Sequence, residues 1–381
     1  MGPTDQSKDR RLLVVGPLPP PIGGGSVSVQ VLLEELSHRA VVPLVVNTSP
    51  RSYRKKTQLA RLETLERGAR ILWKYLREIR RCDAVIVYAT NTLLLTLGYL
   101  FVLAARAWGK PIYLKPLGAD LGSFIEARRA PLRGHLITVL QAATGVLAQT
   151  HQLQDELRAL SCTNIYYVPG YRPPLTDCLS KRDGAGLHLV FVSQIVREKG
   201  PFLLLDAMRR LAAEAETDVR CDFYGPVLAE DRTAFFERLA ATPGVEYCGL
   251  VQAGGASLLM TAYDALAFPT SYGGEGHPGV IIEAMQAGLP IISTHHRAIA
   301  ELVEDGENGL LVPRGDCDAL TAAIRRLAFD RRLREHMGRA SQHRAKAFSS
   351  DVVIPQLLAL IFRDGRRPAH DHLACGSVKV D

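Results

Sequence analysis

Short apolar segments alternate with longer stretches of helical periodicity along most of the chain. The apolar segments have the length and composition of buried strands. The expected strands lie at 12–15, 41–46, 84–88, 111–114, 145–148 and 165–168 in the first half, and at 187–192, 219–224, 245–248, 265–268, 289–293 and 309–312 in the second. Such alternation predicts an α/β fold in which parallel sheets are covered by helices on both faces.

A turn-rich stretch without periodicity, 171–186, separates the two halves. We therefore expect two tandem doubly wound, Rossmann-like domains, an N-terminal one over 1–178 and a C-terminal one over 187–350. Ligands bind such domains at the carboxyl ends of the strands, so we expect a cleft between two facing domains. A final helix, 351–363, is expected to return to the N-terminal domain, and 364–381 is expected to form a flexible tail.

Length and composition agree with two globular domains. The chain has 381 residues, of which 47% are hydrophobic and 22% charged, which excludes disordered, collagen-like and coiled-coil proteins. Seven cysteines without paired spacing indicate a reducing compartment. The longest apolar run, 93–105, is shorter than the roughly 20 residues of a membrane-spanning helix, and the N-terminus lacks the pattern of a signal peptide. We expect a cytoplasmic protein, with 93–105 as a buried helix.

The charge is concentrated in the first half of the chain. Residues 1–180 hold 23 Lys and Arg against 13 Asp and Glu, and residues 51–81 alone hold 11 against 3. Apolar residues recur there at intervals of three and four, as on one face of a helix. Two interpretations stay open: a helix that covers the sheet with a solvated basic side, or a peripheral contact with anionic lipid at the inner face of the membrane. Nothing accompanies the segment that would predict nucleic-acid binding.

The segment 264–316 carries the clearest chemistry. A buried strand, 265–268, is followed by a loop and then by a helix that Pro278 opens and Gly288 ends. A helix that begins at the carboxyl end of a strand presents free N–H groups and the positive end of its dipole. The arrangement predicts a site for an anion such as phosphate.

Two carboxylates flank this predicted anion site. Glu275 lies in the loop, and Glu283 lies inside the helix among apolar residues. A buried charge needs a partner, so two interpretations of Glu283 stay open. It faces solvent or pairs with a nearby arginine, or it accepts hydrogen bonds from two vicinal hydroxyls of a ligand, such as those of a ribose.

The two glutamates are separated by seven residues in GGEGHPGVIIEAMQAGLPII, which resembles the signature of retaining glycosyltransferases of the GT-B fold, family 4. Further similar motifs are GPLPPPIGGGSVSVQVL at 16–32, FVSQIVREKGPFLLLDAM at 191–208, DFYGP at 222–226 and ELVEDGENGLLVPRGD at 301–316. The resemblance implies GT-B architecture and transfer of a hexose, with retention and without a metal cofactor. The donor would be a nucleoside-diphosphate sugar, expected to be a UDP-sugar. The acceptor would be a glycan, a lipid-linked glycan or a small molecule.

The resemblance also implies roles for particular residues. Glu275 would approach the reacting carbon of the sugar, Lys199 would hold the diphosphate, and Glu283 would bind the ribose. The implied donor-binding set is Gly23, Gly24, Gln194, Arg197, Lys199, Glu275, Gly276, His277, Gly279, Val280 and Glu283. Gln194 stands where the family usually has an arginine, and our hypothesis is that Arg197 compensates for it.

The N-terminal half offers weaker signals. The glycines at 23–25 follow the first strand but fit neither a Walker A nor a dinucleotide motif. They form either a tight turn or, by resemblance, a contact with the diphosphate. On the acceptor side Leu117 stands where the family has a histidine, and Lys115 or Asp120 is expected to serve instead.

Several alternatives accompany this prediction. The enzyme rival is a nucleotide-sugar epimerase of the same fold, and the non-enzyme rival is a catalytically silent subunit that binds sugar nucleotides. Asp316 and Asp318 resemble a metal-binding Asp-x-Asp motif, but Asp316 is expected to cap a helix. The adjacent His295 and His296 have no ligand spacing for zinc.

Overall fold

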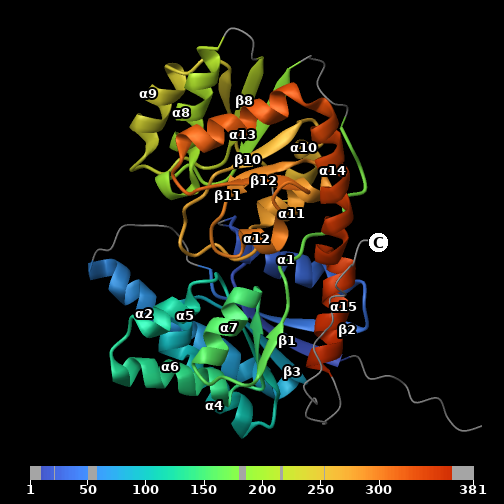
Figure 1. The fold of residues 1–381 in the computed structure, drawn as a ribbon. Coiled ribbons are helices and arrows are strands. Elements are labelled where there is room, and N and C mark those ends of the chain that lie inside the picture. Colours follow the sequence, from blue (N-terminus) through green and yellow to red (C-terminus); the bar gives the residue numbers. More distant parts are fainter. Residues whose placement is uncertain are drawn as a thin grey trace, which may run out of the picture. The chain divides into compact units, whose positions relative to one another are not determined.

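The computed structural model describes residues 10–20, 22–49, 58–179, 186–214, 218–252 and 254–362. The chain divides into two compact units (Figure 1). Unit 1 comprises Met1–Pro169 and Ser350–Asp381, and unit 2 comprises Gly170–Ser349. The tail expected at 364–381 lies outside the described residues, as do the side chains of 51–64 in the basic segment.

Unit 1 is built on a parallel sheet with the strand order β2-β1-β3-β4-β5-β6. Its strands are β1 (Arg10–Gly16), β2 (Val41–Asn47), β3 (Ala84–Ala89), β4 (Ile112–Pro116), β5 (Gly145–Ala148) and β6 (Ile165–Tyr167). Its helices are α1 (Gly24–Ser37), α2 (Gln58–Glu78), α3 (Asn91–Leu93), α4 (Tyr99–Ala107), α5 (Leu121–Glu126), α6 (Ala130–Ala142), α7 (His151–Ala159) and α15 (Ser350–Ile361). All residues of β3, β4 and β5 are buried, as expected for inner strands covered on both faces.

Unit 2 repeats the plan with the strand order β12-β11-β10-β7-β8-β9. Its strands are β7 (Leu187–Val192), β8 (Val219–Tyr224), β9 (Val245–Gly249), β10 (Ala265–Phe268), β11 (Ile291–Thr294) and β12 (Gly309–Val312). Its helices are α8 (Pro201–Ala212), α9 (Arg232–Ala240), α10 (Ala256–Met260), α11 (Gly279–Gln286), α12 (Ile299–Leu302), α13 (Cys317–Phe329) and α14 (Arg331–Ala345). The predicted α/β fold with two doubly wound sheets is confirmed.

The strand orders show where each sheet should bind a ligand. In unit 2 the chain starts at β7, builds outward to β9, then returns to build the other half from β10 to β12. In unit 1 the corresponding reversal lies between β1 and β3. Ligands of doubly wound sheets bind beyond the carboxyl ends of the strands at this reversal. In unit 2 these are the loops that follow β7 and β10.

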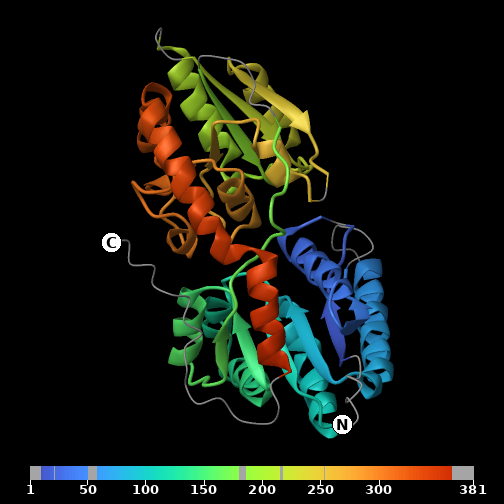
Figure 2. The same cartoon turned by 90° about the vertical axis from the view of Figure 1, so that its right-hand side faces the viewer.

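The unit boundary differs from the one expected at residue 178. Residues 170–178 belong to unit 2, because Arg172 forms a parallel bridge with Ser349 and Pro173 O accepts a hydrogen bond from Gln286 of α11. The last helix, α15, belongs to unit 1, against which it packs in Figure 1 and Figure 2. Tyr113 of β4 donates a hydrogen bond to Leu360 O of this helix.

The apolar run at 93–105 is not one buried helix. It is divided into α3, a π-helical turn at Leu94–Gly98, and α4. Tyr99, Leu100 and Leu103 of α4 are exposed, because the run is apolar on both sides of the helix and only one side meets the core. No helix in the described ranges is long and apolar enough to span a bilayer, and no disulfide joins the six cysteines found there.

Candidate functional site

The loops after β7 and β10 carry the two residues predicted to be catalytic. Lys199 Nζ lies 2.5 Å from Glu275 Oε1, and Thr270 Oγ1 donates to the same oxygen at 3.0 Å. The Lys199 ammonium also lies 4.2 Å from the centre of the Tyr272 ring. Glu275 is only 5% exposed, so its carboxylate needs these partners in place of water. Lys199, which is half-buried, and the buried Glu275 therefore form one ion pair.

A close backbone approach holds the two loops together. Gly200 has a φ of +87°, and a Cβ there would lie 2.2 Å from the Pro269 carbonyl oxygen. Only glycine satisfies both conditions without strain. Nearby, Ser271 N donates to Glu198 O at 2.7 Å. The positions of Lys199 and Glu275 are therefore fixed by backbone contacts between their loops.

Helix α11 begins directly after the loop that carries Glu275. Pro278 is its N-cap, Gly279 is its first residue, and Gly288, with a φ of +73°, follows its end as predicted. Its first N–H groups and positive dipole end lie beyond the carboxyl end of β10. Gly276 is buried in the preceding loop, and Val280 is half-buried in the first turn. This geometry suits an anion.

Glu283 has the arginine partner that we left open as one interpretation. Arg172 Nε lies 2.6 Å from Glu283 Oε1, and the two side chains are 7% and 14% exposed. Sequence reasoning missed Arg172 because it lies in the turn-rich stretch, 111 residues from Glu283. The apolar neighbours of Glu283 in the sequence predict a positively charged partner for its carboxylate, but they do not identify the residue.

The side chain of His277, one of the predicted donor-binding residues, makes its contacts within the protein. The side chain is fully buried, and its Nδ1 accepts a hydrogen bond from Gly170 N at 3.3 Å. Its Nε2 lies 3.2 Å from Glu301 Oε2, and its ring packs edge-on against Phe348. Since both ring nitrogens are engaged, His277 braces the loop between Glu275 and α11.

Arg197 pairs with Asp231, whereas our hypothesis gave it a role in binding the diphosphate. Its backbone N–H and its Nε each lie 3.1 Å from a carboxylate oxygen of Asp231. Its guanidinium also packs over the Phe202 ring at 4.7 Å. Gln194 is half-buried at the exit of β7. The geometry thus gives no support to Arg197 as the replacement for an arginine at 194.

In unit 1 the predicted glycines open helix α1. Gly23 is the N-cap and Gly24 the first residue of α1. Both are exposed, and no atom of the described residues lies within 4 Å of a Cβ placed there. A Cβ at Gly25 would lie 2.9 Å from Leu117 Cδ2. Leu117, which stands where the family has a histidine, thus packs on the start of α1. Both interpretations of the glycine loop remain compatible with this geometry.

The two acceptor-side candidates have different environments. Lys115 is 3% exposed, and its Nζ donates to Val168 O at 2.9 Å. This burial lowers the pKa of the Lys115 ammonium to about 7. Asp120 is half-buried at the N-cap of α5. Within the described ranges no hydrogen bond or ion pair joins Lys115 to Asp120.

The discounted Asp-x-Asp motif is a helix cap. Asp316 Oδ1 accepts a hydrogen bond from Ala319 N at 2.9 Å at the start of α13, which confirms the expected role.

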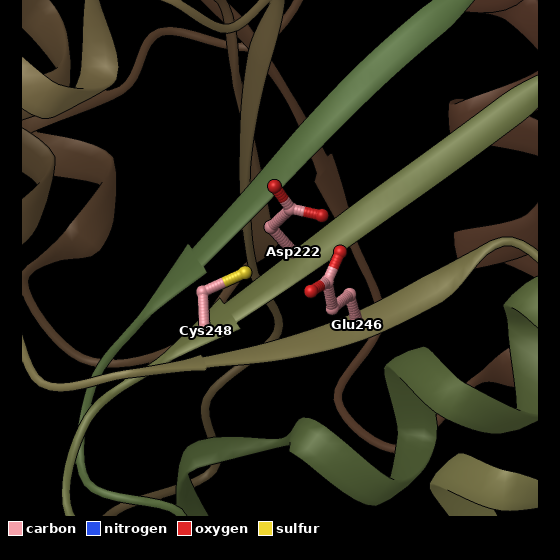
Figure 3. Close-up of side chains that lie close together, drawn as sticks. All are labelled: Asp222, Glu246 and Cys248. Atoms are coloured by element: carbon pink, nitrogen blue, oxygen red, sulfur yellow. The ribbon is translucent and has the colours of Figure 1, made fainter.

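Among the residues that the structure describes, one group of acidic and cysteine side chains could hold a cation. Asp222 of β8 and Glu246 and Cys248 of β9 point toward one another (Figure 3), with potential ligand atoms within 4.8 Å. Asp222 Oδ2 already accepts a hydrogen bond from Tyr263 Oη at 2.8 Å, and His188 Nε2 lies 3.3 Å from Oδ1. Asp222 also lies in the middle of its strand, away from the loops that carry Lys199 and Glu275. We assign the group to a polar network on the sheet.

Comparison with known sequences identifies relatives of this chain. WcaL of Salmonella typhimurium, named as a colanic acid biosynthesis glycosyltransferase, is 30% identical over 189 residues, which cover 48% of this chain and 46% of that protein. MMP α-(1→4)-mannosyltransferase of Mycolicibacterium hassiacum is 29% identical over 271 residues, which cover 68% and 60%. The chain thus matches about half the length of these curated relatives.

Among solved structures, Anabaena HepE in complex with UDP and glucose has a similar fold, with a TM-score of 0.68 and 16% identity. The match covers 92% of this chain and 99% of HepE. Residues 186–330, which contain Lys199, Glu275 and Glu283, match the family Glycosyl transferases group 1. By this match residues 186–330 are similar to the group 1 glycosyltransferases, and the two Rossmann-like domains have the GT-B fold.

Proposed function

We propose that the protein is a retaining hexosyltransferase that uses a nucleoside-diphosphate sugar, with uridine as the base. The observation that carries the proposal is the arrangement around α11. The Lys199–Glu275 ion pair, a helix N-terminus and the half-buried Glu283 lie at the reversal of the sheet in unit 2. HepE binds UDP and glucose, and WcaL is named for polysaccharide biosynthesis, which supports a sugar-nucleotide donor.

In this proposal each part of the site has one task. The start of α11 and Lys199 bind the diphosphate, and Glu283 accepts hydrogen bonds from the ribose hydroxyls. The acceptor oxygen forms a bond to the anomeric carbon on the face from which the diphosphate leaves. The acceptor proton passes to a leaving phosphate oxygen. Charge builds on that phosphate as its bond to the sugar breaks, and preorganised donors such as Lys199 and the α11 N–H groups lower the barrier.

Lys199 and Glu275 neutralise each other before the donor is present. A diphosphate offers Lys199 a stronger anionic partner, and the sugar hydroxyls offer donors to Glu275. The pair therefore holds both side chains in place in their loops, so little ordering is needed when the donor binds. All steps assigned to these residues are metal-independent in this proposal.

Calorimetric titration tests the donor proposal. With EDTA present, we expect UDP to bind more tightly than GDP, ADP or CDP. Glu283→Gln should weaken binding about 10-fold to 100-fold, because it removes charge-assisted hydrogen bonds to the ribose. Glu237→Gln, an exposed change on α9, is the matched control. Both variants are checked for a native fold by circular dichroism, because loss of the Glu283 charge is expected to lower the melting temperature.

The outcomes separate the rivals. Binding of none of these nucleotides by the folded protein would overturn the proposal in favour of a catalytically silent subunit. Release of an altered sugar with the nucleotide, without any acceptor, would favour the epimerase. Transfer to an added glycan acceptor with the anomeric configuration kept would support the proposed reaction, and an inverted product would contradict it.

We further propose that the acceptor is presented at an anionic membrane surface facing the cytoplasm. Exposed aromatic and basic residues of α2, α4 and their ends form what we call the α2–α4 surface. Arg77 packs over Trp73 and Arg80 over Trp108, with 5.0 and 5.2 Å to the ring centres. The two tryptophans are 59% and 37% exposed. Arginine next to exposed tryptophan suits the headgroup layer of a bilayer, where apolar rings and cations both find partners.

A further inference from the structure

Arg172 lies in the first segment of unit 2 and is tied down at several points. Its backbone N–H donates to Phe348 O at 3.1 Å, and its Nη1 donates to Tyr171 O at 2.9 Å. The next residue, Pro173, accepts a hydrogen bond from Gln286 near the end of α11. Because the backbone on both sides is fixed, the guanidinium has a defined position relative to α11.

That position is directly against the start of the helix. A Cβ at Gly279 would lie 1.5 Å from Arg172 Nη2, so the guanidinium occupies the space that any other side chain at 279 would fill. A cation at a helix N-terminus is disfavoured by the dipole. The Glu283 carboxylate, one turn further along α11, offsets this with its 2.6 Å contact to Arg172 Nε. The absence of a side chain at Gly279 thus makes room for the Arg172 guanidinium, and Glu283 balances its charge.

The contact uses only part of the Glu283 carboxylate. Arg172 binds Oε1, and Oε2 makes no hydrogen bond to any residue that the structure describes. A carboxylate has acceptor sites for about four hydrogen bonds. A ribose that offers two adjacent hydroxyls needs two of them, held at a fixed angle. The Arg172 contact leaves these acceptors available and stops the side chain from rotating.

We infer that Arg172 is a positioning residue which fixes the Glu283 carboxylate for the ribose diol, and so makes the site select nucleotides that carry both ribose hydroxyls. This inference rests on the proposed function, in which Glu283 holds the ribose. Arg172 does not touch the sugar in this scheme. It acts through Glu283, so its loss should affect nucleotides with and without the hydroxyls differently.

The experiment measures selectivity rather than affinity alone. Dissociation constants are determined for UDP and 2′,3′-dideoxy-UDP, or for the matching pair with whichever base binds in the screen described above. We expect the wild-type protein to prefer the ribonucleotide about 10-fold to 100-fold. Arg172→Gln should bring the ratio of the two dissociation constants close to one. Arg172→Lys keeps the charge but lacks the planar guanidinium, so it should lower the ratio at least about threefold.

The controls separate this inference from the proposed function. Arg220→Gln, at a side chain that is 70% exposed, should leave the ratio unchanged. If Glu283→Gln removes the selectivity but Arg172→Gln keeps it, the role of Arg172 is overturned while that of Glu283 stands. If the wild type does not distinguish the two nucleotides, or binds neither, the ribose role of Glu283 fails and the inference with it. Should Arg172→Gln not fold, Arg172→Lys decides, and an unchanged ratio in it overturns the inference.

In the double variant the two changes should not add. Removing both partners should cost little more selectivity than removing Glu283 alone, because Arg172 acts only through that carboxylate. Additive losses would show that Arg172 contacts the nucleotide by a separate route and would contradict a positioning role.

Discussion

At the scale of single residues, some residues of the site can be placed from their position in a loop after a strand, and others cannot. Glu275 and Lys199 lie in the loops that follow two buried strands, so the sequence alone places them at one sheet edge, and they form an ion pair there. Arg172 and Glu301 were not predicted. They reach Glu283 and His277 through long-range contacts, and no local pattern specifies which distant charge meets a buried group.

Lys115 allows a prediction about pH. Burial lowers the pKa of the Lys115 ammonium to about 7, whereas the pKa of an unfolded lysine is about 10.4. Between these values the unfolded chain binds more protons than the folded one, so the free energy of unfolding rises with pH. Below about pH 7 both states are protonated, and the destabilisation is full and constant.

The check is the melting temperature of the wild type minus that of Lys115→Met, from pH 6 to pH 10. We expect this difference to be flat below about pH 7 and to rise above it. Lys110→Met, at a half-buried lysine next to β4, is measured alongside as the control for the loss of a lysine side chain. A difference that stays flat to pH 10 would mean that the Lys115 amine titrates in its ordinary range.

At the scale of elements, the sequence predicts the strands well. Residues 145–148, 187–192, 219–224, 265–268 and 309–312 have the bounds observed for β5, β7, β8, β10 and β12, because inner strands of parallel sheets read as continuous apolar runs. The interruption between α3 and α4 and the exposed side of α4 were missed. A run that is apolar all round does not reveal which of its sides meets the core.

Helix α15 supplies a prediction at this scale. Its residues Val353, Ile354, Leu357, Leu360 and Ile361 are buried, and each buried aliphatic side chain contributes about 1.5–3 kcal/mol. In a chain that ends after Ser349, unit 1 should therefore be destabilised. We expect its melting temperature to be lower by about 10 °C or more. A chain that ends after Phe362 should melt like the full one. Equal melting of both truncated chains would show that α15 contributes little.

At the scale of the whole molecule, charge is distributed unequally. Residues 1–180 carry the excess of Lys and Arg, while 181–381 hold 23 basic and 26 acidic residues. The α2–α4 surface lies in the basic part, so attraction to anionic lipid should act on unit 1. This attraction amounts to about 1 kcal/mol per basic residue near the headgroups and weakens with salt.

Sedimentation with vesicles tests the membrane proposal. We expect binding to vesicles that contain phosphatidylglycerol, little binding to pure phosphatidylcholine, and a loss of binding at high salt. The double variant Trp73→Ala, Trp108→Ala should bind several-fold more weakly. Phe329→Ala, an equally exposed aromatic change in unit 2, is the control. Equal binding of wild type and double variant would exclude the α2–α4 surface as the contact.

The discontinuous course of unit 1 bears on the order in which the protein can fold during synthesis. Unit 2 is one uninterrupted segment, whereas unit 1 needs residues from both sides of it. At about 5–20 residues per second, translation delivers all of unit 2 while unit 1 still waits for α15. The face of unit 1 that α15 covers stays open during that interval. A chaperone that recognises nascent apolar surfaces would therefore meet the N-terminal half of this chain longer than the C-terminal half.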